Sequence, residues 1–146
     1  SYNKIIANFH ETYSALNKIV LNKIDRNQPP TVNGDGSQAY DFIYVEDVAR
    51  CNISALESDV KHGNYNVGTE VQTTIKELCD TILELKKSSL EVVYKPYTAD
   101  DARALVQNRI GSAKKAAEEL KFNYKFSLEE GLQKLIDWRN ETMNLN

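Results

Sequence analysis

Glycine is scarce in this sequence, and its placement excludes the usual phosphate-binding turns. The 146 residues include six glycines, at positions 34, 36, 63, 68, 111 and 131, and no G-x-G-x-x-G or G-x-x-x-x-G-K pattern is found among them. Such turns need glycine because only glycine lets backbone amides approach a pyrophosphate closely. Gly34-Asp35-Gly36 is a turn signal, and the sequence predicts no cofactor-binding residues.

Other residue types that carry chemistry are also few. The two histidines, His10 and His62, have no neighbours at metal-ligand or catalytic-triad spacing. None of the eight tyrosines has a lysine four residues later, the spacing that sets an ammonium beside a phenol on a helix. Cys51 and Cys79 occupy apolar positions of helical patterns, which predicts reduced core residues. We therefore predict no catalytic residue and no metal site in this chain.

The sequence also lacks long apolar runs and an excess of positive charge. No window approaches the ~20 apolar residues of a bilayer span, and the first residues show no signal-peptide pattern. Lysine and arginine total 18 against 21 aspartates and glutamates, and the isoelectric point is near 5.4. These features predict a soluble, cytoplasmic protein with neither a membrane nor a nucleic-acid partner.

The length and the apolar periodicity predict one α/β domain. With 146 residues and 41% hydrophobic content, the chain is long enough for one core and short for two. Helices are expected over 11–26, from 46 or 47, from 74, after 112 and from 127, and strands over 31–33, 40–45, 64–67 and 90–94. This alternation predicts a small sheet of short strands with about five helices. The polar connection 97–111 is long enough to be functional.

Local signals set several boundaries. The turn from Gly34 to Ser37 separates two predicted strands, which could pair as a hairpin. The second helix begins at acidic residues, of which Asp47 is expected to be a helix cap. Two further helix starts have the spacing of capping boxes: Thr74 with Glu77, and Ser127 with Glu130.

Hydrophobic spacing predicts a further feature of the second helix, because Val48, Ile53 and Leu56 are expected to share one face.

One run of the sequence closely resembles a known family. Residues 29–49 read P-P-T-V-N-G-D-G-S-Q-A-Y-D-F-I-Y-V-E-D-V-A. The run is similar to P-x-I-Y-G-D-G-S-Q-x-R-D-F-I-Y-V-x-D-V-A of the extended short-chain dehydrogenase/reductase family, in its NAD-dependent, UDP-glucose 4-epimerase-like epimerases and dehydratases. Residues 64–69 resemble the family's Y-N-V-G-T-G, residues 74–78 its S-I-x-E-L, and residues 112–122 and 127–138 its last two helices. The resemblance covers residues 28–139 in the same order.

This resemblance implies a lobe of a larger enzyme. Family members are usually about twice as long, and their first half carries the glycine-rich cofactor turn and a tyrosine-lysine pair. The resemblance therefore implies that residues 1–146 form a single substrate-binding domain, with the N-terminal NAD-binding Rossmann domain absent. NAD is the cofactor of the full-length family, and none is expected in this chain. The expected ligand is a nucleotide sugar, with a UDP-sugar as the first candidate.

Carried over residue by residue, the resemblance implies a nucleotide contact near the G-D-G turn. The family position that contacts the base falls on Asn33, with Val32 beside it. The family arginine that contacts the phosphates, just before D-F, falls on Tyr40. Tyrosine donates one hydrogen bond but offers no charge, so either another cation compensates or the nucleotide binds differently.

A second phosphate-binding element of the family, G-D-V-R, is matched loosely by residues 100–103. It implies Asp101 and Arg103 as further contacts, and Arg109 is a competing candidate because it stands at the end of the same connection. For either arginine, a surface salt bridge is the alternative interpretation.

Two hypotheses follow from the resemblance. In the first, the chain is the nucleotide-sugar-binding part of an NAD-dependent sugar epimerase or dehydratase and has no catalytic activity alone. In the second, it is a free-standing homo-oligomeric interaction module that kept the fold. A lobe that lacks its neighbour exposes an apolar face, so homo-oligomerisation is expected, with the residues before the G-D-G turn as the first candidate contact surface.

Overall fold

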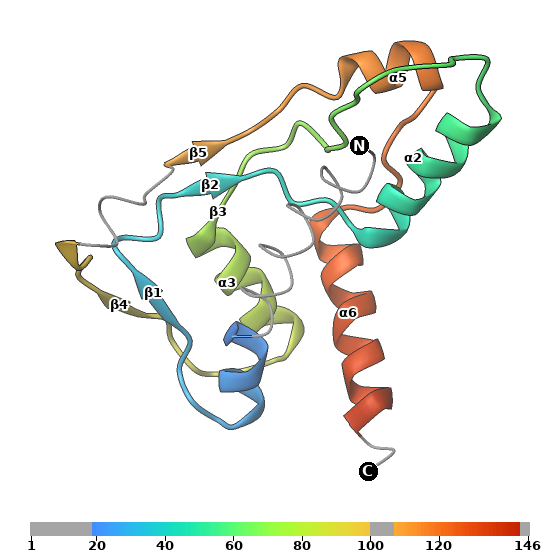
Figure 1. Cartoon of the computed structure of the whole chain (residues 1–146). Helices are drawn as coiled ribbons and strands as arrows, with labels where there is room; N and C mark the ends of the chain where they lie inside the picture. Colours follow the sequence, from blue (N-terminus) through green and yellow to red (C-terminus); the bar gives the residue numbers. More distant parts are fainter. Residues whose placement is uncertain (1–18, 100–106, 144–146) are drawn as a thin grey trace. The chain divides into compact units, whose positions relative to one another are not determined.

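The computed structural model describes residues 19–99 and 107–143, whose helices and strands are drawn in Figure 1. The contacts among these residues divide the chain into two compact units. Of the described residues, unit 1 contains 19–42, 70–99 and 107–111, and unit 2 contains 43–69 and 112–143. Helices alternate with short strands along the chain, which confirms the predicted α/β class. The single substrate-binding domain over residues 1–146 stays a prediction.

The strands of unit 1 form two small sheets. β1 (Thr31–Asn33) pairs in parallel with β4 (Val93–Lys95). In the other sheet, β2 (Ala39–Tyr40) lies between β3 (Thr73–Thr74), which is antiparallel, and β5 (Asn108–Arg109), which is parallel (Figure 1). All the strands are two or three residues long, so the sheet is small, as predicted.

The predicted hairpin is wrong. β1 and β2 do not pair with each other, because each has a partner from later in the chain. The backbone N–H of Gly34 donates to Lys95 O (2.7 Å), so the turn is bonded to the end of β4 and not to its own second flank. The strand predicted over 40–45 ends at Tyr40, because the backbone pairing with β3 and β5 involves only residues 39 and 40; the next residue, Asp41, accepts a hydrogen bond on its side chain from Glu70 N (2.8 Å).

Among the described residues, two helices and the strands build the core of unit 1. Residues 19–25 are helical, and the part of the predicted helix over 11–18 lies outside the described residues. α3 (Ile75–Leu85) begins at the predicted capping box, which is confirmed: Thr74 N donates to Glu77 Oε2 (2.7 Å) and Glu77 N donates to Thr74 Oγ1 (3.1 Å). Lys86 and Asp25, at the two helix ends, form an ion pair (2.8 Å). The buried apolar residues include Val20, Leu21, Ile24, Val32, Leu78, Cys79 and Ile82.

Unit 2 contains three helices, α2 (Val45–Glu57), α5 (Lys114–Leu120) and α6 (Leu128–Met143). Its core gathers the inner residues of α2 and α5 with neighbouring loop residues, namely Ile43, Cys51, Tyr65, Ala116, Leu120 and Phe122. The second predicted capping box is confirmed, because Ser127 N donates to Glu130 Oε2 (2.8 Å) and Glu130 N donates to Ser127 Oγ (3.2 Å).

Two predictions for unit 2 are wrong. The inner face of α2 carries Cys51, with Val48 packed beside it, whereas Ile53 and Leu56 are exposed, Leu56 by 85% of its surface. Residues 64–67 form no strand, because no described strand pairs with them. Tyr65, an aromatic residue of a type common in strands, packs its ring in the core instead, and its hydroxyl donates to Glu119 Oε2 (2.6 Å).

Candidate functional site

Polar and cationic residues stand at the carboxyl ends of four strands in unit 1. Asn33 is the last residue of β1, Lys95 of β4, Tyr40 of β2 and Arg109 of β5. The strands pair in parallel, so that Asn33 is the register partner of Lys95, and Tyr40 is the register partner of Arg109. Ligands of open α/β sheets bind in the region outside the carboxyl ends of the strands. These two pairs are therefore the candidate site.

One member of the first pair, Lys95, lines a hollow, and the other, Asn33, directly precedes the lining residue Gly34. Asn33 and Lys95 are both exposed. A volume of about 530 Å³ opens beside this end of β1 and β4, and its lining residues are Gly34, Asp35, Lys76, Tyr94, Lys95 and Pro96. Pockets that hold small ligands commonly have volumes of ~300–1,000 Å³. The volume of the hollow falls within this range, but the hollow is wide open to solvent, so a ligand in it would stay partly exposed.

The two lysines that line the hollow differ in their partners. Lys76 forms an ion pair with Asp80, one helical turn later in α3, and this hydrogen bond raises the pKa of Lys76 above its ordinary value. The Lys95 ammonium has no hydrogen bond or ion pair with any residue of 19–99 or 107–143. A ligand in the hollow would therefore meet one lysine whose charge is paired among the described residues, Lys76, and one whose charge is not, Lys95.

The turn between β1 and β2 shapes the rim of this hollow. Gly34 and Gly36 have φ angles of +79° and +76°, a region that favours glycine. A Cβ on Gly34 would lie 2.2 Å from the Tyr97 ring, and a Cβ on Gly36 would lie 3.2 Å from the Tyr94 ring. The Asp35 carboxylate accepts from Ser37 N (2.9 Å), and the hydrogen bonds with Ser37 lower the pKa of Asp35.

This turn does not fit a dinucleotide. In a dinucleotide fingerprint, a glycine-rich turn leads from a strand into a helix and leaves room for a pyrophosphate. Here the turn leads into β2, and tyrosine rings occupy the space beside both glycines. Nothing else in the described ranges offers a glycine-rich strand-to-helix turn, so we derive no step that involves NAD from this chain.

The second pair lies on the other sheet. Tyr40 is partly buried, and its ring packs edge-on against Phe42, with ring centroids 6.1 Å apart. The neighbouring segment is fixed to β5 by a hydrogen bond from Ala39 N to Gln107 O (2.9 Å), and Gln107 Nε2 donates to Ser37 Oγ (3.0 Å). The pairing thus brings residue 109 next to residue 40, which sequence reasoning did not anticipate.

The other predicted site residues are placed differently. Val32 is buried, with 5% of its surface exposed, so a ligand contact from this position would come from its backbone. Asp101 and Arg103 lie outside the described residues. Lys95 was missed, and the signal that could have found it is its place at the end of a predicted strand, directly before Pro96.

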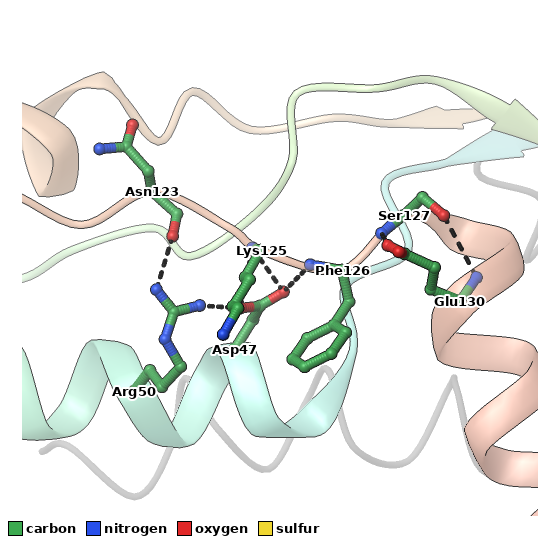
Figure 2. Close-up of polar contacts among 7 residues, drawn as sticks. All are labelled: Asp47, Arg50, Asn123, Lys125, Phe126, Ser127 and Glu130. Atoms are coloured by element: carbon green, nitrogen blue, oxygen red, sulfur yellow. Dashed lines mark hydrogen bonds and ion pairs between the residues drawn. The ribbon is translucent and has the colours of Figure 1, made fainter.

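Asp47 in unit 2 was predicted to be a helix cap, and this is wrong. The N-cap residue of α2 is Tyr44, and no side chain caps the helix. Asp47 is fully buried, and its carboxylate accepts hydrogen bonds from Lys125 N and Phe126 N (3.0 Å each). Arg50 also pairs with this carboxylate and donates to Asn123 O (3.1 Å), as Figure 2 shows. Asp47 therefore fixes the segment that leads into α6.

The structure gives no support to metal or thiol chemistry. Within residues 19–99 and 107–143, no group of histidine, cysteine and acidic side chains is arranged to hold a metal ion. Cys51 and Cys79 are free and buried, as predicted. Burial raises the pKa of Cys51, and burial together with the nearby Asp80 raises the pKa of Cys79 to about 11, so both thiols stay protonated at neutral pH. No helix among the described residues is long and apolar enough to cross a bilayer.

Comparisons with known proteins agree on one family. Residues 3–68 match the NAD dependent epimerase/dehydratase family. The chain is 36% identical over 120 residues to UDP-glucuronic acid decarboxylase 1 of Arabidopsis thaliana, a match that covers 82% of this chain and 26% of that protein. It is 31% identical over 115 residues to UDP-N-acetyl-alpha-D-glucosaminuronate decarboxylase of Bacillus cytotoxicus, which covers 77% of this chain and 36% of that protein.

A solved structure supports the same relationship. UDP-glucose 4-epimerase of Thermotoga maritima, crystallised with UDP-glucose, superimposes with a TM-score of 0.76 at 31% identity, over 88% of this chain and 40% of that one. The chain belongs to the NAD-dependent epimerase/dehydratase family of extended short-chain dehydrogenase/reductases. It spans about a quarter to two fifths of the length of these relatives.

Proposed function

We propose that this chain binds a nucleotide sugar, with a UDP-sugar as the first candidate, as the substrate-binding part of an NAD-dependent sugar epimerase or dehydratase. The observation that carries the proposal is the placement of Asn33, Lys95, Tyr40 and Arg109 at strand carboxyl ends, in two register pairs. The names of the three relatives all refer to UDP-linked sugars or acids, and one was crystallised with UDP-glucose.

The chemistry of the ligand matches what these positions supply. A nucleotide sugar needs hydrogen-bonding groups for its base and cations for its two phosphates. Lys95 supplies donors in the hollow, and its register partner Asn33 supplies an amide that can both donate and accept. At the other pair, Tyr40 supplies a phenol in place of the arginine that the family resemblance leads one to expect, and we propose that Arg109 supplies the missing positive charge. Asp101 and Arg103 remain proposed contacts.

Catalysis is not assigned to the chain alone. Neither a tyrosine-lysine pair at i, i+4 nor a dinucleotide turn occurs in its sequence. We propose that NAD binding and hydride transfer in the whole protein belong to a part that corresponds to the remaining length of the relatives. The isolated chain is then expected to bind the nucleotide sugar without converting it.

A calorimetric titration tests the proposal. The chain is titrated with UDP-glucose, with dTDP- and GDP-sugars, and with free glucose. Binding of at least one nucleotide sugar at millimolar or lower concentration, without binding of glucose, is expected. Absence of heat with every nucleotide sugar at millimolar concentration would contradict the proposal.

The role of Arg109 is tested separately. Arg109→Gln is expected to weaken UDP-glucose binding about ten- to a hundredfold, because a charged hydrogen bond to phosphate contributes ~1.5–3 kcal/mol, while binding of uridine is unchanged. The exposed Arg26, in the same unit, supplies the matched control Arg26→Gln. If both substitutions have the same effect on UDP-glucose, the assignment of Arg109 is wrong.

Self-association is a second candidate function, and the surface of α2 favours it. The exposed face of this helix carries Val45, Ala49, Ile53 and Leu56, with Ile53 exposed by 53%. Contiguous apolar surface of this kind promotes association. We propose that a second copy of the chain covers this face, whereas the surface expected from the sequence, before the G-D-G turn, lies largely outside the described residues.

Sedimentation velocity distinguishes a monomeric chain from a self-associated one. The chain is expected to form dimers or larger oligomers at high concentration, and Leu56→Glu is expected to shift it toward the monomer. The exposed Glu57→Gln is a control that leaves the apolar face intact. A monomer at every concentration, with and without the substitution, would contradict self-association.

A further inference from the structure

The end of the β1 and β4 pair combines two side chains with different hydrogen-bonding abilities. Asn33 and Lys95 are register partners at the carboxyl ends of parallel strands, so their side chains leave the same face of the sheet. An asparagine amide both donates and accepts, and it can turn to suit either kind of partner. A lysine ammonium only donates. Lys95 is therefore the member of the pair that can distinguish an acceptor from a donor.

The surroundings of Lys95 leave its ammonium available to a ligand. It is exposed, it lines the hollow of about 530 Å³, and it has no ionic or hydrogen-bonding partner within 19–99 and 107–143. The other lysine of the hollow, Lys76, is paired with Asp80. Tyr94 offers an aromatic surface to a flat, neutral ring such as a base, because 42% of its surface is exposed. Its ring packs next to Gly36.

We propose that Lys95 is a specificity-determining residue that reads the base of the nucleotide, donating a hydrogen bond to a carbonyl oxygen on the base edge. This inference rests on the proposed nucleotide-sugar site. A hydrogen bond from Lys95 would select bases that have a carbonyl group at the position where cytosine has an amino group. Uracil and thymine have a carbonyl oxygen there, which accepts a hydrogen bond from the ammonium. Cytosine has an amino group there, and two donors cannot form a hydrogen bond with each other.

Tyr94 has a different role from Lys95, because it contributes affinity but no base specificity. An aromatic ring offers its face to every base, so it contributes affinity without distinguishing uracil from cytosine. In this chain Tyr94 supplies the aromatic surface that Asn33, at the position before the G-D-G turn, does not. The hollow lies past the strand ends, so that residues of both sheet faces line it.

The test compares dissociation constants for UDP and CDP, which share ribose and phosphates and differ only in the base edge. The wild-type chain is expected to bind UDP about tenfold more tightly than CDP, and Lys95→Met is expected to remove most of this preference. Lys95→Arg keeps a donor and is expected to keep the preference. Tyr94→Ala is expected to weaken both nucleotides by the same factor.

Each outcome has a defined meaning. Lys61→Met, a substitution of an exposed lysine in unit 2, controls for the change in net charge, and circular dichroism checks that each variant is folded. If the chain binds UDP and CDP equally, or if Lys95→Met leaves the ratio unchanged, Lys95 does not read the base while the proposed site stands. If no nucleotide binds the wild-type chain, the proposed function and this inference both fail.

Discussion

Asp47 offers the sharpest test of how the described structure is held together. Its buried carboxylate accepts hydrogen bonds from two consecutive backbone amides, those of Lys125 and Phe126, and from Arg50 (Figure 2). The substitution Asp47→Asn keeps the shape of the side chain but replaces one oxygen with an amino group. Whichever way the amide turns, its amino group then faces a backbone or guanidinium donor.

The expected cost follows from these bonds. A hydrogen bond to a charged group contributes ~1.5–3 kcal/mol, and a buried donor left without an acceptor costs ~1–3 kcal/mol. The remaining oxygen satisfies part of the site, and Arg50 is exposed enough to turn toward water. We therefore expect Asp47→Asn to lower the free energy of unfolding by about 2–4 kcal/mol, a large share of the ~5–15 kcal/mol that typical domains possess.

Urea unfolding and amide hydrogen exchange measure this effect together. The exchange of the Lys125 and Phe126 amides is expected to accelerate first, because these are the amides that lose their acceptor. Asp59→Asn, at an exposed aspartate just after α2, is the matched control. A loss of stability below about 1 kcal/mol, with unchanged exchange at residues 125 and 126, would refute the reasoning.

Three further predictions concern unit 1. Gly34→Ala is expected to lower the free energy of unfolding by about 1–3 kcal/mol, since the backbone has a positive φ and a Cβ would meet the Tyr97 ring. Tyr97→Ala should relieve part of this loss in a double-mutant cycle measured by urea unfolding. Thr74→Ala is expected to cost about 1 kcal/mol of unfolding free energy because it removes the side-chain half of the capping box, with the exposed Ser89→Ala as the comparison. The pKa of the Cys79 thiol is near its ordinary value of 9.0 in the unfolded chain and about 11 in the folded one, so its contribution to stability is complete below pH 9 and is lost as the pH rises toward 11. Cys79→Ala should lack this loss in a series of unfolding curves from pH 8 to 11, and identical pH profiles would count against the assigned burial.

Sequence reasoning succeeded where the physical signal is local. The two capping boxes, at Thr74 and Ser127, are formed by residues three positions apart, and both are present as predicted. The buried, reduced state of Cys51 and Cys79 also followed from helical periodicity. The motif around the G-D-G turn indicated the family, which the comparisons support.

Predictions that depend on distant partners were less successful. Pairing of β1 with β4 joins residues about sixty positions apart, so the local turn signal between β1 and β2 suggested a hairpin that does not form. The acceptor role of Asp47 depends on amides far along the chain, and nothing near it in the sequence shows this. Lys95 became a site candidate only when its strand was placed beside β1, because the register makes it the partner of Asn33.

The central claim is that the strand ends of unit 1 form a nucleotide-sugar site. Two-dimensional ¹H–¹⁵N correlation spectra of the chain, recorded during titration with UDP-glucose, test it most directly. The account predicts saturable shifts of the amides of Asn33, Tyr40, Lys95 and Arg109 and of their strand neighbours, with the amides of α2 and α6 unaffected. Shifts confined to unit 2, or no shifts at millimolar UDP-glucose, would contradict it.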